Sequence, residues 1–230
     1  MILLAIDTST TTSALALLLA DGATTTIAGD PSQRHGRGLV AAIGGLLSSN
    51  GLTPRDVDAF AVGLGPGSYT GLRVGLTAMK VMAYAVGRPL SGLDSLEAIA
   101  RNAPADALRV SAIADAQRGE FYAADFSRTE SGGPLARLGP TRIEPASAWI
   151  AGLEEGDFAI GPGLARLGSP LPAMIRMAEP ASCHPSGEGL IALARENFML
   201  GKADDPWFLE PLYLRRSAAE DQWDARSRTS

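Results

Sequence analysis

The chain has 230 residues, of which 46% are hydrophobic and 20% charged, and its formal net charge is −5 at pH 7. This composition is typical of a globular protein with one large or two small domains. The acidic balance argues against an autonomous nucleic-acid-binding protein, which needs a basic face. No apolar stretch approaches the ~20 residues of a membrane-spanning helix. The single cysteine, Cys183, excludes an intrachain disulfide, and with no signal-peptide pattern at the start it predicts a cytoplasmic protein.

The first half of the sequence predicts an α/β domain that begins with three antiparallel strands. Apolar runs at 2–6 and 14–19 are separated by a short polar turn, and Asp21-Gly22 favours a hairpin before a third strand at 24–28. The pattern then predicts a helix over 35–50, a strand over 59–64, a helix over 70–86, a strand over 90–93 and a helix over 95–102. This order mixes antiparallel neighbours with crossover connections, as layered α/β proteins do.

The second half begins with a similar pattern. An apolar strand at 109–114 ends in Asp115, as the strand at 2–6 ends in Asp7, and a polar turn and a strand at 120–126 follow. This weak repeat indicates two lobes of similar architecture, because an internal repeat reflects the organisation of the fold. Residues 127–145 and 164–185 are rich in turns, and helices are expected near 145–153 and 189–200. We therefore expect lobes at 1–103 and 104–215, followed by a polar tail at 216–230.

The turn after the first strand, which includes Asp7, Thr8 and Ser9, is a first candidate site. An aspartate at a strand end, followed by hydroxyls and backbone N–H groups, can hold a magnesium–phosphate group. The alternative, which the local chemistry favours, is an Asx or Ser/Thr turn that only closes a hairpin.

A glycine-rich turn, Gly63-Leu-Gly-Pro-Gly-Ser-Tyr-Thr-Gly71, is the second candidate, since it leads into a helix N-terminus that can bind an anion. Close packing of the helix is the alternative use of its glycines. The turn lacks the Gly-Lys-Ser/Thr ending of a P-loop and the features of a Rossmann fingerprint. The sequence has no metal-binding helix motif and no Gly-x-Ser-x-Gly elbow, and neither His35 nor His184 has a liganding neighbour. We therefore predict neither catalytic nor metal-ligating residues.

The helix at 70–86 is apolar or small around more than half of its circumference, whereas a helix on a sheet needs a stripe of only ~100°. Leu72, Leu76, Met79 and Ala83 form the stripe expected to face the sheet. The remaining arc needs a second covering surface, either from this chain or from a partner. We expect a partner, because small residues let helices approach closely. The expected contact residues are Ala41, Gly45 and Ser48 of the helix at 35–50, and Gly71, Gly75, Ala78 and Met82 of the helix at 70–86.

Five segments, in this order, resemble the bacterial TsaB (YeaZ) family. They are 2–10, Arg34-His35, the glycine-rich stretch 63–75, Ala114-Asp-Ala-Gln-Arg-Gly-Glu-Phe-Tyr122 and Glu210-Pro-Leu-Tyr-Leu-Arg215. The resemblance extends along nearly the whole chain. It implies an actin-like, ribonuclease-H-like (ASKHA) fold of two repeated α/β lobes, in which the turns at Asp7–Thr10 and Asp115–Gly119 correspond to phosphate-contacting turns. Thr8 stands where nucleotide-binding relatives commonly have glycine, so no tightly bound cofactor is expected.

The resemblance also implies a function. Members of the family support the synthesis of N6-threonylcarbamoyladenosine at position 37 of tRNA, in which TsaD transfers the threonylcarbamoyl group and TsaE is an ATPase that joins TsaB and TsaD. It therefore implies a non-catalytic pairing subunit that binds TsaD, TsaE or a second copy of itself, reaches tRNA only through the complex, and leaves ATP and Mg²⁺ to its partners. The rival hypothesis is a small actin-like nucleotide-dependent phosphotransferase with Asp7 as its magnesium ligand.

Overall fold

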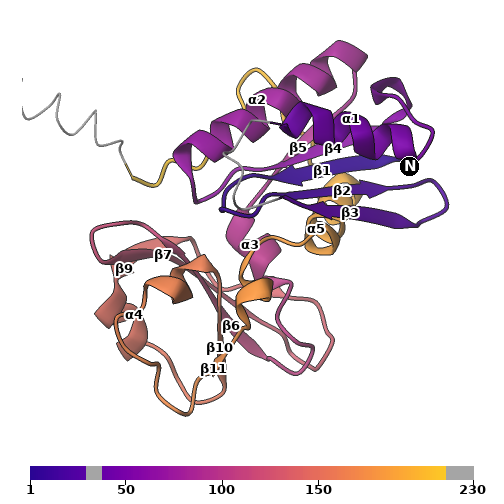
Figure 1. Cartoon of the computed structure of the whole chain (residues 1–230). Coiled ribbons are helices and arrows are strands. Elements are labelled where there is room, and N and C mark those ends of the chain that lie inside the picture. The colour runs from indigo at the N-terminus through magenta and orange to yellow at the C-terminus, as the bar shows by residue number, and fades with distance from the viewer. Residues whose placement is uncertain (30–37, 216–230) are drawn as a thin grey trace, which may run out of the picture.

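The computed structural model describes residues 1–29 and 38–215, which form two α/β lobes, each built on one mixed sheet (Figure 1). In the first sheet the strand order is β3-β2-β1-β4-β5. Its strands are β1 (Leu3–Asp7), β2 (Ala14–Leu18), β3 (Thr24–Ala28), β4 (Ala59–Gly63) and β5 (Leu90–Leu93). The three N-terminal strands are antiparallel, whereas β4 is parallel to both β1 and β5.

The second sheet repeats this arrangement. Its order is β11-β10-β6-β7-β8, and β9 also pairs with β7. The strands are β6 (Arg109–Asp115), β7 (Glu120–Ser127), β8 (Ala136–Arg137), β9 (Arg142–Pro145), β10 (Asp157–Ile160) and β11 (Arg176–Met177). Like β1, β6 is antiparallel to the next strand and parallel to a later one. The predicted repeat and the actin-like, ribonuclease-H-like fold are thus confirmed.

Helices cover both faces of the first sheet. On one face, α1 (Leu39–Ser49) and α2 (Tyr69–Val86) bury their apolar sides against alternate residues of β1, such as Leu4 and Ile6. On the other face, α5 (Gly187–Met199) packs on Leu3 and Ala5. Because both faces are covered, β1 and β4 are continuous apolar runs rather than alternating ones.

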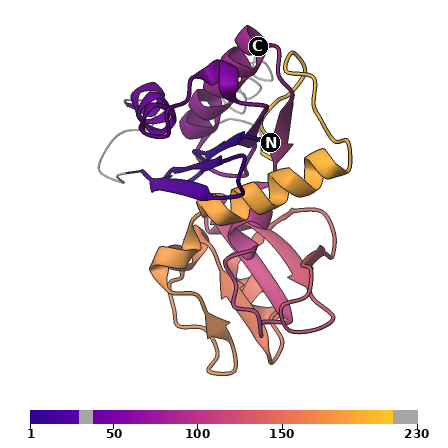
Figure 2. The ribbon, with the colours of Figure 1, turned by 90° about the vertical axis from the view of Figure 1, so that its right-hand side faces the viewer.

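Two helices connect the lobes by crossing between them. The helix α3 (Ser95–Ala100) follows the first sheet but packs on the second, whereas α5 follows the second sheet and packs on the first. Figure 2 shows α5 lying between the two sheets. The last helix of the expected C-terminal lobe at 104–215 therefore packs on the first sheet. The spacing of apolar residues identifies the apolar face of a helix, but it does not identify the sheet on which that face packs.

The remaining elements are short. The helix α4 (Ala146–Ala151) covers the second sheet with Trp149. The 3-10 helices are η1 (Pro54–Asp56), η2 (Pro162–Arg166) and η3 (Pro180–Cys183). The strands β8, β9 and β11 lie in segments expected to be turn-rich, since two- to four-residue strands depend on their partners rather than on a local pattern. The first residues of the helix predicted at 35–50, with Arg34 and His35, lie outside the described residues.

The described chain ends in a strap, residues 203–215, that returns to the first sheet. Asp204 bridges to the edge strand β5, where its N–H donates to Leu90 O at 2.8 Å and its carboxylate accepts from Gly92 N at 2.7 Å. The strap thereby covers a strand edge whose backbone groups would otherwise be unpaired. Across residues 1–29 and 38–215, every helix is too short or too polar to cross a membrane.

Candidate functional site

The carboxylate of Asp7 lies at the end of β1, where the sequence suggested a magnesium ligand, but it is only 1% exposed. Its Oδ1 accepts a hydrogen bond from Ser9 N at 2.7 Å, and its Oδ2 accepts one from the Ser95 hydroxyl at 2.6 Å. Burial raises the pKa of Asp7, although these hydrogen bonds favour the charged form. Both oxygens are thus committed to internal contacts, and Asp7 joins its own turn to the start of α3.

The glycine-rich turn and the first turns of α2 cover the Asp7 turn directly. Thr8 Oγ1 donates to Gly71 O at 2.7 Å, and Ser68 N donates to Ser9 O at 2.7 Å. Three glycines make this approach close. A Cβ at Gly67 would lie 2.3 Å from Ser9 O, and at Gly71 and Gly75 it would lie 2.0 Å and 2.3 Å from the O and Oγ1 atoms of Thr8. The backbone of α2 thus fills the space next to the Asp7 turn in which a bound anion would have to lie.

The structure therefore corrects the expected partner contact at Gly71 and Gly75. Both are buried, and both face Thr8 of the same chain. A helical wheel shows that these glycines lie off the sheet-facing stripe of α2. It cannot show that the turn after β1 occupies the adjoining space, because that turn is about sixty residues earlier in the sequence.

The corresponding turn of the second lobe, at Asp115–Gly119 after β6, is also held by internal contacts. Asp115 Oδ1 accepts a hydrogen bond from Gln117 N at 2.6 Å, and Asp115 Oδ2 lies 3.2 Å from Arg166 Nε. The turn contains two left-handed non-glycine residues, Gln117 (φ 63°) and Arg118 (φ 56°). The two aspartates therefore play corresponding parts in the two lobes, since each accepts a hydrogen bond from the backbone N–H two residues later.

The strap joins both lobes beside these turns. Leu212 N donates to Leu64 O at 2.8 Å in the first lobe, while Arg215 donates to Ala116 O at 2.7 Å and pairs with Glu120 in the second. Tyr213 lies between these contacts. Sequence reasoning included this segment in the family resemblance but did not assign it a place in the fold, since its partners are about 100 to 150 residues earlier.

At Tyr213 the strap meets the first turn of α2. The Tyr213 hydroxyl accepts a hydrogen bond from Arg73 Nε at 2.8 Å. The rings of Tyr213 and Tyr69 are 5.4 Å apart, and the Arg73 guanidinium lies 4.4 Å from the centre of the Tyr69 ring. These stacked contacts fix the strap against α2.

The surface that remains open is the side of α1 and α2 that points away from the sheet, which we term the helix face. Its side chains are small or apolar, and Val40 is 73% and Val81 60% exposed. Of the expected contact residues, Ala41, Gly45 and Ser48 are exposed here, whereas Ala78 and Met82 are half-buried against the core. The helix face consists of Val40, Ala41, Gly44, Gly45 and Ser48 of α1 with Thr77, Val81, Tyr84 and Ala85 of α2.

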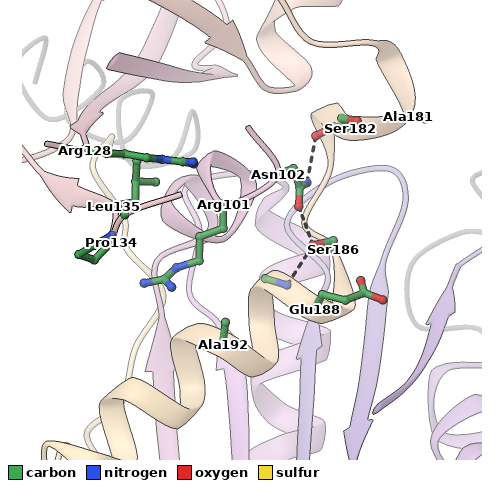
Figure 3. A pocket seen from close by; sticks show the side chains of 12 residues that line it. Arg101, Asn102, Arg128, Pro134, Leu135, Ala181, Ser182, Ser186, Glu188 and Ala192 are labelled. Carbon is green, nitrogen blue, oxygen red and sulfur yellow. Dashed lines mark hydrogen bonds between the residues drawn. The ribbon is translucent and has the colours of Figure 1, made fainter. Parts of the chain in front are cut away.

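A cavity of about 620 Å³ lies elsewhere, between α3, α5 and the loop that leads to β8 (Figure 3). Its polar groups mainly hold the two lobes together. The Asn102 amide donates to Ser182 O at 3.0 Å and to His184 O at 2.7 Å, and it accepts from the Ser186 hydroxyl that caps α5. Arg101 pairs with Glu97 and Glu196, and Arg128 donates to three backbone carbonyls. These contacts mark a structural junction rather than a prepared ligand site.

A family model described as "TsaD: tRNA N6-adenosine threonylcarbamoyltransferase" matches residues 29–146. A Bacillus subtilis protein, "tRNA threonylcarbamoyladenosine biosynthesis protein TsaB", is 30% identical over 97% of this chain and 98% of its own length. The chain belongs to the TsaB family. The Escherichia coli protein of that name is 29% identical over 94% of this chain and 96% of its own length.

A solved structure agrees with the family assignment. YeaZ from Pseudomonas aeruginosa superposes with a TM-score of 0.76 at 27% identity, covering 92% of this chain and all of that one. The match to the TsaD model includes α1, α2 and the first strands of the second sheet, so this TsaB-family chain also shares sequence features with a transferase family. Within residues 1–29 and 38–215, no three His, Cys, Asp or Glu side chains gather as metal ligands would.

Proposed function

We propose that this chain is a non-catalytic pairing subunit in the synthesis of N6-threonylcarbamoyladenosine at tRNA position 37. Its relatives carry the name of that pathway, and the TsaD model matches half of its length. The main partner is a TsaD-type transferase, which the helix face binds, with TsaE joining the pair. A second copy of the chain is the alternative occupant of the same face.

The observation that carries the proposal is the contrast between the covered Asp7 turn and the exposed helix face. The Asp7 turn is covered by α2, so the carboxylate of Asp7, the candidate magnesium ligand, is not open to a magnesium–nucleotide. The helix face is exposed and apolar and has a flank of small residues that permits close helix approach. We therefore assign ATP and Mg²⁺ to the partners, tRNA contact to the assembled complex, and the site of action to the cytoplasm. The buried and hydrogen-bonded carboxylate of Asp7 weighs against the rival phosphotransferase, which takes Asp7 as its magnesium ligand.

The test is a titration of the full chain with the TsaD-type protein of the same organism. Val81→Arg places a charge in the helix face and is expected to weaken pairing at least tenfold. Leu138→Arg, at a 59% exposed position of the second lobe, is the matched control and should bind as the wild type does. Equal binding by both variants would place the contact elsewhere.

A reconstituted transfer assay tests the absence of catalysis. Asp7→Asn keeps the shape of the buried side chain and should leave the transfer rate within a few-fold of wild type. A loss of several orders of magnitude, with pairing and folding intact, would favour the enzymatic alternative.

A further inference from the structure

The helix face continues from Tyr84 onto two aromatic residues of the strap, which lie outside α1 and α2. Tyr84 of α2 is 67% exposed, and its ring meets Trp207 of the strap edge-to-face at 5.3 Å. Trp207 is 72% exposed, and the next residue, Phe208, is 83% exposed. We call Tyr84, Trp207 and Phe208 the aromatic patch. Figure 2 shows α1, α2 and the strap beside the same lobe, and the ring contact between Tyr84 and Trp207 joins α2 to the strap.

The patch is presented by a fixed turn rather than by a loose end. The Asp205 carboxylate accepts a hydrogen bond from Trp207 N at 2.8 Å, and Asp205 O accepts one from Phe208 N at 3.1 Å. Leu209, the residue after the patch, is 9% exposed and belongs to the core beneath α2. Because the backbone that carries the two aromatic side chains is already ordered, it loses little further conformational entropy on binding.

The area of the patch indicates that it is part of a larger interface. An aromatic side chain offers about 150–250 Å², so three that are two-thirds to four-fifths exposed present roughly 400–500 Å². A stable interface takes about 800 Å² from each partner. The patch alone is too small for stable association, so it would have to act together with the adjoining helix face.

The charges around the patch define the partner's chemistry. The helix α1 has no charged residue, and Arg73 and Lys80 are the only charged residues of α2, in a chain of net charge −5. Lys80 is half-buried one turn before Tyr84, on the same side of the helix. No carboxylate pairs with it anywhere in the described part of the chain. At an interface, a lysine without a carboxylate partner in its own chain is matched by a carboxylate of the binding partner.

From these observations we infer that the aromatic patch and Lys80 form one end of the partner interface. They receive an apolar helical surface of the transferase partner that carries a carboxylate opposite Lys80. This inference rests on the proposed function, because it takes the same partner. It adds that the C-terminal strap, and not only α1 and α2, determines the affinity. Aromatic side chains near the centre of an interface commonly contribute most of its binding energy.

The experiment is a titration of full-length variants with the transferase partner. The double substitution of Trp207→Ala and Phe208→Ala should weaken pairing at least tenfold, while the melting temperature stays close to wild type because both side chains are exposed. Met199→Ala is the matched control, since Met199 is also 83% exposed but lies at the end of α5, on the opposite face of the sheet. Lys80→Glu should also weaken pairing at least tenfold, whereas Lys202→Glu, at the only other lysine, should change it less than twofold.

Each outcome separates this inference from the proposed function. If Val81→Arg weakens pairing but the strap variants do not, the helix face stands and the patch is refuted. If Met199→Ala weakens pairing as much as the strap variants, the patch has no specific part and the inference fails. If the strap substitutions dissociate a dimer of this chain without affecting the transferase, a second copy is the occupant, which overturns the inference. If the wild type does not pair with the transferase at all, both proposals fail.

Discussion

Gly75 offers the sharpest test of the packing that closes the Asp7 turn. A methyl group added there would lie 2.3 Å from Thr8 Oγ1 and 3.4 Å from both Thr8 Cβ and Cγ2. Gly75→Ala therefore forces the Thr8 hydroxyl to move. That hydroxyl donates a buried hydrogen bond to Gly71 O at 2.7 Å, which the movement breaks.

The effects on the free energy of unfolding oppose one another. Overpacking costs about 1–3 kcal/mol, and the lost hydrogen bond costs about 0.5–1.5 kcal/mol. Replacing a helical glycine by alanine returns about 0.8–1 kcal/mol. The net expectation is a loss of roughly 1–3 kcal/mol, which in a protein of this size lowers the melting temperature by about 2–4 °C for each kcal/mol.

The assay is thermal melting of four proteins: wild type, Gly75→Ala, Thr8→Ala and the double variant. Without the Thr8 hydroxyl, the added methyl has room, so Gly75→Ala in the Thr8→Ala background should be neutral or stabilising by up to about 1 kcal/mol. Gly44→Ala is the control, because an added Cβ there has nothing within 4 Å, and it should raise the melting temperature. If Gly75→Ala also stabilises the wild-type background, the close packing of α2 on Thr8 is wrong.

Three further predictions concern the same turns and the junction between the lobes. Addition of 1 mM ATP with Mg²⁺ should raise the melting temperature of the isolated chain by less than about 2 °C, whereas a site with a Kd of about 10 µM would add about 2.7 kcal/mol. Because burial raises the pKa of Asp7 above 3.8, its contribution to stability is present below that pH and is lost as the pH rises through the native pKa. Asp7→Asn avoids this loss, so its melting temperature relative to wild type should increase from pH 3.5 towards neutrality, and a constant difference would contradict the assignment. Asn102→Ala removes the hydrogen bonds to Ser182 O, His184 O and Ser186, and should lower the unfolding free energy in urea by about 1–3 kcal/mol, an expectation that an unchanged midpoint would refute.

Short-range patterns in the sequence predicted most of the helices and strands, and they also indicated the family. The apolar runs ending in Asp7 and Asp115 predicted the strands that begin each sheet, and their repetition predicted two related lobes. The buried side of α1 was evident from its spacing. These features depend on neighbours within a turn or a hairpin, so a single sequence contains them in full. The family resemblance likewise rests on contiguous motifs, and the comparisons confirmed it.

Contacts between distant segments were decided only by the tertiary structure. The two glycines of α2, Gly71 and Gly75, suggested an open surface, yet both face Thr8, because the turn after β1 enters the space that glycine leaves. Similarly, the spacing of α5 gave its apolar side but not the sheet that receives it, and the strap showed no local sign that Tyr213 would reach Arg73. The physical reason is common to these cases. Periodicity reports which side of an element is buried, whereas the group that buries it is set by chain topology, which brings together residues 60 to 190 positions apart.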